Sequence, residues 1–430
     1  LCRIHRHLGA TVHGINHLGD WGMPFAKMMT AYMRWGNEQE LHRSPMRYMF
    51  DLYKRYGQEV KVHPELDNEA AAHFQALERN AGAERKLWLF LRDESLKAFQ
   101  GPYSRLGVTF DHVTGESFFE NKMEAAMQRV ARAGVLEDSE GAQVVWLKEL
   151  GIKEPCLLRK SDGTTLYHTR DLAAAFWREE QYHPDRILYV VGAEQKLHFD
   201  QLKGVLTRMQ EKVAAAVEHV PFGLVLSRTE DGKWEKFASR AGNAVFLDEI
   251  LDEAVAKVRA IIREKNPDLP DADAVAEQVG VSAIVFNDLK NSRIKDVKFD
   301  WDAMLNFEGE TGPYVQYACA RLASILRKVD APVTAPSAVD FTQLADAERV
   351  LLTMLDFGPA VQRAAEQSEP SIVTAQTIAL AGEIHSYLRD HYVLGAEPAV
   401  RDARLFLVDA ARRLLTTGLA LLGIAAPERM

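Results

Sequence analysis

The segment TTLYHTRDLAAAFW (Thr164–Trp177) places a tyrosine and an aspartate four residues apart. Its β-branched start predicts a short strand over 165–168, and Thr169 is suited to cap a helix that follows. Tyr167 would then end the strand, and Asp171 would lie in the first helical turn, where the helix dipole alone favours an acidic residue. The functional alternative is that Asp171 faces a cleft and binds a planar cation, because a guanidinium donates two parallel hydrogen bonds to a carboxylate.

A second polar segment follows RILYVVGA (186–193), a run that predicts a buried strand. Gly192, at the end of this strand, permits close approach of a ligand to the backbone. Gln195 and His198 come next and offer hydrogen-bond donors and acceptors without net charge, which suits a nucleoside or an amino-acid backbone. The alternative is that neighbouring loops satisfy both side chains.

A third segment, KWEKFASRAGNAVF (233–246), places two cations in a loop just before a helix. Lys236 and Arg240 flank Ser239, and Gly242 follows them. Cations in a mobile loop neutralise the charge that develops on phosphates during phosphoryl or adenylyl transfer. The alternative, and the commoner meaning of such charges in isolation, is a solvated basic loop.

The fourth segment, NHLGDWGMPF (16–25), follows TVHGIN (11–16), which predicts a strand. A turn at the carboxyl end of such a strand is where open α/β sheets bind ligands, although it is more often a simple strand-to-helix connection. His17 and Asp20 are also of metal-ligand type, but the other nearby histidines are scattered along the chain, and no metal site is expected.

The composition describes a globular protein of two or three domains in 430 residues, 47% of them hydrophobic. Its net charge of −9 argues against a generally basic nucleic-acid-binding surface, although a local basic patch remains compatible with it. No apolar run approaches the ~20 residues of a membrane span. Cys2, Cys156 and Cys319 lack CxxC spacing, so neither a zinc site nor a disulfide framework is indicated, and a cytoplasmic location fits best.

The chain changes character near residue 246. Before it, strand-like runs alternate with helix-length segments, which predicts βαβ units and a parallel sheet, and PFGLVLS (221–227) reads as a further buried strand. After it, apolar residues fall at helical spacing from Leu247 onward, with Asp248 as a cap or first-turn acid. VDAPVTAPSAVD (329–340) predicts a loop, and the segment 400–424 predicts an amphipathic helix that runs into a glycine-broken one.

Taken together and in chain order, these segments resemble the bacterial arginyl-tRNA synthetases, which are class I aminoacyl-tRNA synthetases. The resemblance covers essentially the whole chain and rests on NHLGDWG, KSDGTTLYHTRDLAAA, YVVGAEQKLHF, GLVLS…KFASRAGNAV, NFEGETGPYVQYACAR and ALLGIAAPERM. It implies an α/β Rossmann-like catalytic core, with a parallel sheet incomplete at its N-terminus, followed by an all-α helical bundle that binds the anticodon. The corresponding domains are a core over 1–245 with a helical insertion at about 38–105, a stem-contact region over 246–310, and an anticodon-binding domain over 311–430.

The resemblance also assigns roles to individual residues. Tyr167 and Asp171 occupy the positions that recognise the guanidinium of arginine, with Gln195 beside them, and Gly192, His198 and Ser239 fall in the ATP and adenylate region. Lys236 and Arg240 match the two lysines of the second class I signature, here KFASR, and are expected to steady pyrophosphate. The residues matched to tRNA contacts are Tyr314, Tyr317, Arg321 and the C-terminal Met430, and for the tyrosines core packing is the alternative.

One family feature is absent from the sequence: the His-x-Gly-His signature that binds ATP. By family order it would precede Leu1, so we expect an N-terminally truncated chain that activates arginine poorly by itself. The other interpretation is a non-catalytic tRNA-binding paralogue. A cysteinyl-type synthetase is disfavoured, because it would need zinc-binding cysteines that this chain does not have.

The implied reaction joins L-arginine to tRNA(Arg) through an arginyl-adenylate. ATP with Mg²⁺ enters as a substrate, and activation is expected to require bound tRNA. The partners are thus tRNA(Arg), L-arginine and ATP, and a monomeric, cytoplasmic protein with no membrane association is expected.

Overall fold

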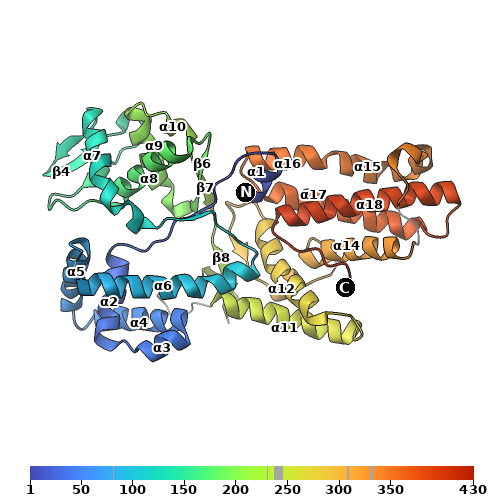
Figure 1. The fold of residues 1–430 in the computed structure, drawn as a ribbon, viewed down its shortest axis with the longest axis horizontal. Helices are drawn as coiled ribbons and strands as arrows, with labels where there is room; N and C mark the ends of the chain where they lie inside the picture. The colour runs from blue at the N-terminus through green and yellow to red at the C-terminus, as the bar shows by residue number, and fades with distance from the viewer. Residues whose placement is uncertain (81, 230, 237–245, 308, 330–332) are drawn as a thin grey trace. The chain divides into compact units, whose positions relative to one another are not determined.

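The computed structural model describes residues 1–430 except 81, 230, 237–245, 308 and 330–332 (Figure 1). The chain divides into two compact units. We call the unit formed by 14–99 and 110–223 the α/β unit, and the unit formed by 1–13, 100–109 and 224–430 the helical unit.

The strands of the α/β unit form parallel pairs and one small antiparallel sheet. β6 (Ile187–Gly192) pairs in parallel with β7 (Val217–Phe222), and β1 (Ile15–Asn16) pairs in parallel with β2 (His112–Val113). The order β3 (Glu137–Ser139), β4 (Ala142–Val145), β5 (Cys156–Arg159) makes the antiparallel sheet. The strand predicted at 186–193 is therefore confirmed, and so is parallel pairing.

Helices α8 and α9 pack beside β6 and β7 in one hydrophobic cluster. Three consecutive alanines of α8, Ala173 to Ala175, are buried there, and their small side chains let the helix approach its neighbours closely. The helical segments of this part are η1 (Glu116–Lys122), α7 (Met123–Arg132), η2 (Lys148–Leu150), α8 (Tyr167–Tyr182), η3 (Ala193–Gln195), α9 (Lys196–Arg208) and α10 (Val213–Ala216).

The rest of the α/β unit is helical and has its own cores around Trp88 and Tyr56. Its helices are α2 (Met23–Trp35), α3 (Glu38–Arg43), α4 (Pro45–Glu59), α5 (Glu65–Glu78) and α6 (Gly82–Arg105), the last of which ends in the helical unit. The Asn37 side chain caps α3 by accepting from the backbone N–H groups of Gln39 and Glu40.

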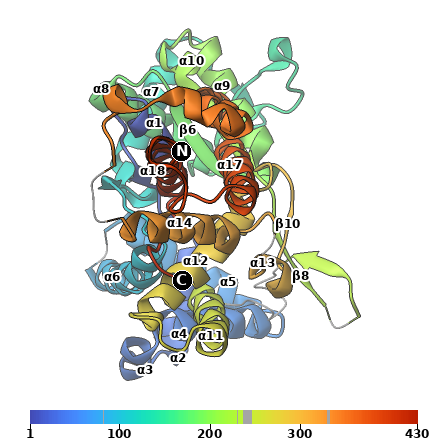
Figure 2. The ribbon, with the colours of Figure 1, turned by 90° about the vertical axis from the view of Figure 1, so that its right-hand side faces the viewer.

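The helical unit is built around α14 (Gly312–Arg327), α17 (Ser371–Asp390) and α18 (Pro398–Leu421), which pack against one another (Figure 2). Their shared core also takes in Ile4 of α1 (Cys2–His7). The other helical segments packed in this bundle are η6 (Phe341–Ala347), α15 (Glu348–Leu355) and α16 (Phe357–Glu366), and η5 (Pro336–Ala338) precedes them.

A second core of the helical unit joins α11 (Leu247–Lys265) to α12 (Ala272–Leu289). At Gly280 an added Cβ would lie 2.8 Å from the backbone nitrogen of Val255, so glycine is required for these two helices to pack so closely. Asp248 is in the first turn of α11, as predicted. The remaining elements are β8 (Val225–Arg228), β9 (Trp234–Lys236), β10 (Val297–Lys298) and α13 (Trp301–Met304).

Three local predictions are wrong. The strand expected over 11–16 is reduced to Ile15–Asn16, and no strand forms at 165–168, where α8 already begins. The run 221–227 is not one buried strand, because β7 ends at Phe222 and β8 begins at Val225 in a different sheet.

The final helix is also longer than predicted, because α18 continues through Gly418. A Cβ there would lie 2.5 Å from Oγ1 of Thr377, so Gly418 allows α18 and α17 to touch and does not interrupt the helix. The break comes at Gly423, whose φ of +77° favours glycine. Cys2, Cys156 and Cys319 are free thiols in the structure. In the described ranges, none of the helices has the length and apolar content that a bilayer span needs.

Candidate functional site

The candidate site begins where the 160–164 turn leads into α8. In this turn Gly163 has φ +85°, and the Asp162 carboxylate accepts from the Thr164 N–H at 2.9 Å. Thr169 does not cap α8 as predicted, because it is buried and its hydroxyl donates to the Leu158 carbonyl at 2.6 Å.

Asp171 is the fifth residue of α8, and the first turn of this helix contains no acidic residue. Its placement in the first turn was therefore wrong. Since the helix dipole acts mainly on the first turn, helix stabilisation alone gives a weak reason for an aspartate at this position.

The Asp171 carboxylate is held by a histidine of the next helix. Oδ2 of Asp171 lies 2.6 Å from Nε2 of His198 in α9, and the two side chains are 18% and 9% exposed. Among the residues that the structure describes, no Lys or Arg forms an ion pair with Asp171. The carboxylate thus remains available to a cation from outside the protein.

Aromatic rings surround this pair. Tyr167 lies one helical turn before Asp171, and its ring centroid is 5.0 Å from that of His198. The ring of His168 lies 4.6 Å from that of His198 on the buried side. Tyr167 is 51% exposed, so it is free to cover a flat cationic ligand bound at Asp171.

A second carboxylate lies close to Asp171, and the sequence did not point to it. Burial raises the pKa of Glu116, and the nearby Asp171 and Asp20 raise it further against the opposing effect of Arg170. Arg170 NH1 lies 3.1 Å from Glu116 Oε2, so its charge is occupied by Glu116. No local pattern in the sequence brings Glu116 to α8, because the two segments meet through tertiary packing.

Asp20 and His17 of the NHLGDWG segment have structural partners. Asp20 is 5% exposed and accepts from both the backbone N–H and the hydroxyl of Ser117. His17 Nδ1 accepts from Arg178 at 3.3 Å, and burial together with the Arg178 charge lowers the pKa of His17. The turn that carries His17 and Asp20 is therefore hydrogen-bonded to α8 through Arg178 and to η1 through Ser117.

The other residues predicted to bind amino acid or ATP follow β6. Gly192 is the last residue of the strand, and a Cβ there would lie 3.0 Å from a carboxylate oxygen of Glu194, so part of the space over its backbone is already occupied. Gln195 is exposed and precedes α9 directly, three residues before His198. The structure thus brings Tyr167, Asp171 and His198 together, with Gln195 at the start of the helix that carries His198.

The predicted phosphate-binding loop is only partly described. Lys236 is exposed at the end of β9, where it pairs with Leu226 of β8. Ser239 and Arg240 lie outside the described residues.

The residues predicted to contact tRNA lie in the helical unit. Tyr317 is 46% exposed and stacks on His385, at 5.8 Å between centroids and 18° between planes, whereas Tyr314 is half-buried. Arg321 donates to the Leu388 carbonyl at 3.2 Å. The Met430 side chain packs against the α11–α12 core, and its carbonyl accepts from Asn266. Tyr314 and Met430 are therefore partly packed against the cores of the helical unit, whereas the ring of Tyr317 is more accessible.

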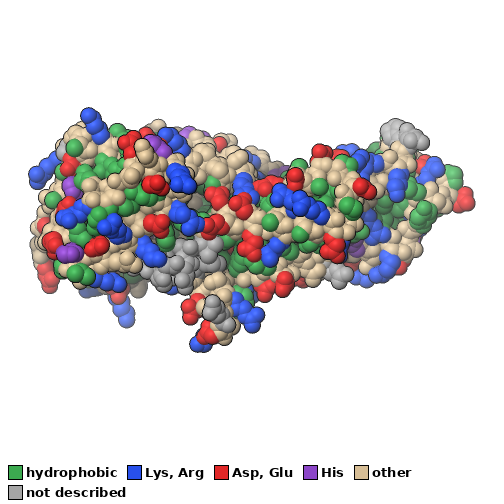
Figure 3. All heavy atoms as spheres, turned by 90° about the horizontal axis from the view of Figure 1, so that it is seen from below, with side chains coloured by type: hydrophobic (Ala, Val, Ile, Leu, Met, Phe, Trp, Pro, Cys, Tyr) green, Lys and Arg blue, Asp and Glu red, His purple; other side chains and the backbone are tan. Residues whose placement is uncertain are grey.

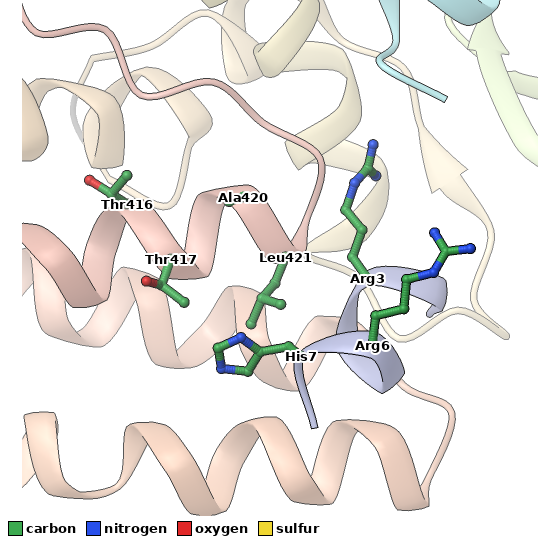
Figure 4. A pocket seen from close by; sticks show the side chains of 7 residues that line it. All are labelled: Arg3, Arg6, His7, Thr416, Thr417, Ala420 and Leu421. Atoms are coloured by element: carbon green, nitrogen blue, oxygen red, sulfur yellow. The ribbon is translucent and has the colours of Figure 1, made fainter. Parts of the chain in front are cut away.

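Asp171 lines neither of two hollows found among the described residues. One, of about 520 Å³, lies between α1 and α18 and is lined by Arg3, Arg6, His7, Thr416, Thr417, Ala420 and Leu421 (Figure 4). Arg3 and Arg6 donate to the carbonyls of Gly107 and Val12, so they hold neighbouring loops. The other, of about 720 Å³, is lined mainly by α7 and α8 residues such as Arg129 and Trp177, and none of the predicted site residues lines it.

Two family models match the chain. The model described as "tRNA synthetases class I (R), catalytic domain" matches residues 1–301, and the "DALR anticodon binding domain" matches residues 315–430. The chain belongs to the class I arginyl-tRNA synthetases. The family's catalytic and helical domains account for the two kinds of architecture described above, as the sequence predicted.

Individual relatives agree with the family match. The arginine–tRNA ligase of Streptococcus mutans is 45% identical over 432 residues, covering 100% of this chain and 75% of that enzyme. The arginine–tRNA ligase of an Exiguobacterium strain is also 45% identical, over 429 residues, with the same coverage. The solved structure of Thermus thermophilus arginyl-tRNA synthetase superposes with a TM-score of 0.86 at 28% identity, covering 100% of this chain and 78% of that one.

Proposed function

We propose that this protein is an arginine–tRNA ligase in which Asp171 recognises the side chain of the amino acid. The observation that carries the proposal is the Asp171 carboxylate, which is largely buried, is bonded to His198, and has no cationic side chain paired with it in the described part of the chain. A guanidinium supplies the missing positive charge and the paired N–H donors that a carboxylate accepts.

A site formed by Asp171 and Tyr167 would select against the two nearest competitors of arginine by different means. Lysine has a positive charge but no planar fork of donors, and citrulline has the planar shape but no charge. Either substrate would leave the Asp171 carboxylate incompletely satisfied, which costs about 1–3 kcal/mol for a buried polar group. Tyr167 would cover the flat face of the guanidinium, and Gln195 would hold the amino-acid backbone.

The proposed reaction has two steps, and no protein nucleophile is needed. A carboxylate oxygen of arginine attacks the α-phosphate of ATP, which comes with Mg²⁺, and pyrophosphate leaves. A ribose hydroxyl at the 3′ end of tRNA(Arg) then attacks the arginyl carbonyl, and AMP leaves. Lys236 and Arg240 would steady the pyrophosphate, with Gly192 and Ser239 near the adenylate, so catalysis rests on positioning and charge stabilisation.

We assign tRNA binding to the helical unit. Tyr317 is the best-placed of the four predicted contacts, because its exposed ring can stack on an unpaired base. On the face drawn in Figure 3, Lys and Arg side chains are intermixed with Asp and Glu, and the net charge is −9. Recognition of the tRNA would therefore rely on local contacts of this kind. We further propose that the protein acts as a cytoplasmic monomer, with domains at 1–245, 246–310 and 311–430.

Exchange of label between pyrophosphate and ATP, measured with the full-length protein, tests this function. We expect exchange to require L-arginine and to be stimulated by tRNA(Arg). Asp171→Asn, which removes the charge but keeps the shape, should raise the KM for arginine at least tenfold and leave the KM for ATP unchanged. A protein that binds tRNA(Arg) but shows no arginine-dependent exchange would be a non-catalytic paralogue. An unchanged arginine KM in Asp171→Asn would remove Asp171 from the pocket.

A further inference from the structure

We propose that His198 is a positioning residue of the arginine pocket, which orients the Asp171 carboxylate toward the guanidinium. This inference rests on the proposed role of Asp171. The sequence placed His198 with ATP and the adenylate, whereas its closest polar partner in the structure is Oδ2 of Asp171, at 2.6 Å from Nε2.

The hydrogen bond to Asp171 indicates which ring nitrogen of His198 carries a proton. A carboxylate only accepts, so Nε2 carries the proton and donates it. Nδ1 of His198 is buried and has no hydrogen-bond partner in the described part of the chain. A doubly protonated ring would leave a buried, unpaired N–H at Nδ1, so the neutral ring protonated at Nε2 fits this environment best.

A neutral donor suits a site that must bind a cation. An arginine or lysine at position 198 would neutralise Asp171 and compete with the substrate, whereas neutral His198 leaves the full negative charge in place. Oδ2 retains a second lone pair, so both carboxylate oxygens can still accept from a guanidinium. His198 thereby fixes the orientation of Asp171 without using up its charge.

The ring of His198 is itself held in place. It lies 5.0 Å from the Tyr167 ring, 4.6 Å from the His168 ring and 4.9 Å from the Phe199 ring. The hydrogen bond therefore joins two helices: α8 carries the Asp171 carboxylate, and α9 carries the His198 donor. Because the carboxylate is ordered before arginine arrives, less conformational freedom is lost when arginine binds.

Two amide substitutions separate a positioning role from simple packing. The amide nitrogen of His198→Gln can extend about as far as Nε2, whereas that of His198→Asn is too short to reach Asp171. We expect His198→Asn to weaken L-arginine binding about tenfold by calorimetric titration, and His198→Gln to stay within about threefold of the parent. In the exchange assay of the full-length protein, the arginine KM should rise, while kcat and the KM for ATP change less than about threefold. Thermal unfolding of each variant checks that it folds, and His198→Leu replaces His198→Asn if the latter does not.

The double variant Asp171→Asn/His198→Asn completes the test. If His198 acts through Asp171, the double variant binds arginine no more weakly than Asp171→Asn alone. Additive losses, an effect on ATP in place of arginine, or equal losses in the Gln and Asn variants would each overturn the positioning role. If Asp171→Asn itself leaves arginine binding unchanged, the proposed function of Asp171 fails. If Asp171→Asn weakens arginine binding but the His198 variants leave it unchanged, only the positioning role of His198 fails.

Discussion

Oδ2 of Asp20 accepts a hydrogen bond from the hydroxyl of Ser117 at 2.7 Å, although 97 residues separate the two in the sequence. The backbone N–H of Ser117 donates to Oδ1 of the same carboxylate at 2.9 Å. The neighbouring Gly115 is needed for this contact, because a Cβ there would lie 2.5 Å from Oδ1. Asp20 thus fixes the start of η1, which carries Glu116 toward Asp171.

We expect Asp20→Ala to destabilise the fold by about 1–3 kcal/mol, because it leaves two donors of Ser117 without their acceptor. Ser117→Ala removes only the hydroxyl bond and should cost about 0.5–1.5 kcal/mol. Urea unfolding of the two variants and of the double variant measures these losses. Equal costs for the two single substitutions would show that the backbone N–H bond contributes nothing.

The acid side of the stability profile should depend on His168. Burial lowers the pKa of His168 to about 4. Between about pH 6.5 and pH 4 the unfolded chain therefore binds a proton at this position that the folded protein does not, so the free energy of unfolding falls as the pH falls through this window. At ~1.4 kcal/mol per pKa unit, lowering the pKa from 6.5 to about 4 makes the loss attributable to His168 about 3–3.5 kcal/mol.

The measurement is urea unfolding at several pH values between 7.5 and 4. Burial also lowers the pKa values of His17 and His385, so these two groups contribute to the pH dependence as well. The contribution of His168 is therefore obtained by comparing the parent with His168→Gln. The variant should lose less stability than the parent on acidification. Parallel profiles for the two proteins would contradict the prediction.

The sequence correctly predicted those strands and helices that are encoded by the pattern of neighbouring residues. The β-branched run at 187–192 and the helical spacing after Leu247 appear in the structure as β6 and α11. Asp171 was placed correctly in a helix, but the start of this helix was placed too late, with Thr169 as its cap in place of Leu166, because the β-branched residues before Tyr167 resemble a strand. That small error changed the expected position of Asp171 relative to the helix dipole.

The contacts that define the candidate site are not local. Asp171 meets His198 across 27 residues, and Arg170 meets Glu116 across 54. Neither pair has a spacing that a single sequence reveals, because each depends on how α8 packs against other elements. The same reason explains the error at 221–227, where an apolar run continuous in sequence is divided between two sheets.

Arg404, in α18, should stabilise the helical unit through its ion pair with Asp346. It donates to the Asp346 carboxylate at 2.6 Å and to the Tyr392 carbonyl at 2.9 Å, and its side chain is 13% exposed. Burial tends to raise the pKa of Asp346, but hydrogen bonds from Arg404 and Tyr387 outweigh it and leave the pKa lowered. We expect Arg404→Met to cost about 2–3 kcal/mol, somewhat less than a fully buried pair, because Asp346 is left partly exposed.

Thermal and urea unfolding test Arg404→Met, with Arg363→Met as the matched control. Arg363 pairs with Asp356 at 3.2 Å, but both side chains are about half exposed, so its loss should cost less than about 1 kcal/mol. Similar losses of unfolding free energy in the two variants would mean that burial of Arg404 does not strengthen its contribution to stability.

Tyr317 should contribute to tRNA binding through its ring and not through its hydroxyl. Its side chain is 46% exposed, and His385 supports one face of the ring by stacking. Stacking of a base on an aromatic side chain is worth about 1–3 kcal/mol, so Tyr317→Ala should weaken tRNA(Arg) binding about tenfold or more, while Tyr317→Phe stays close to the parent. Filter binding or fluorescence titration at one fixed salt concentration measures the affinity, because binding to a polyanion depends on salt. The affinity for L-arginine, titrated in the same variants, should not change, since Asp171 and Tyr317 belong to different units of the chain. Unchanged tRNA affinity in Tyr317→Ala would assign this ring to helix packing alone.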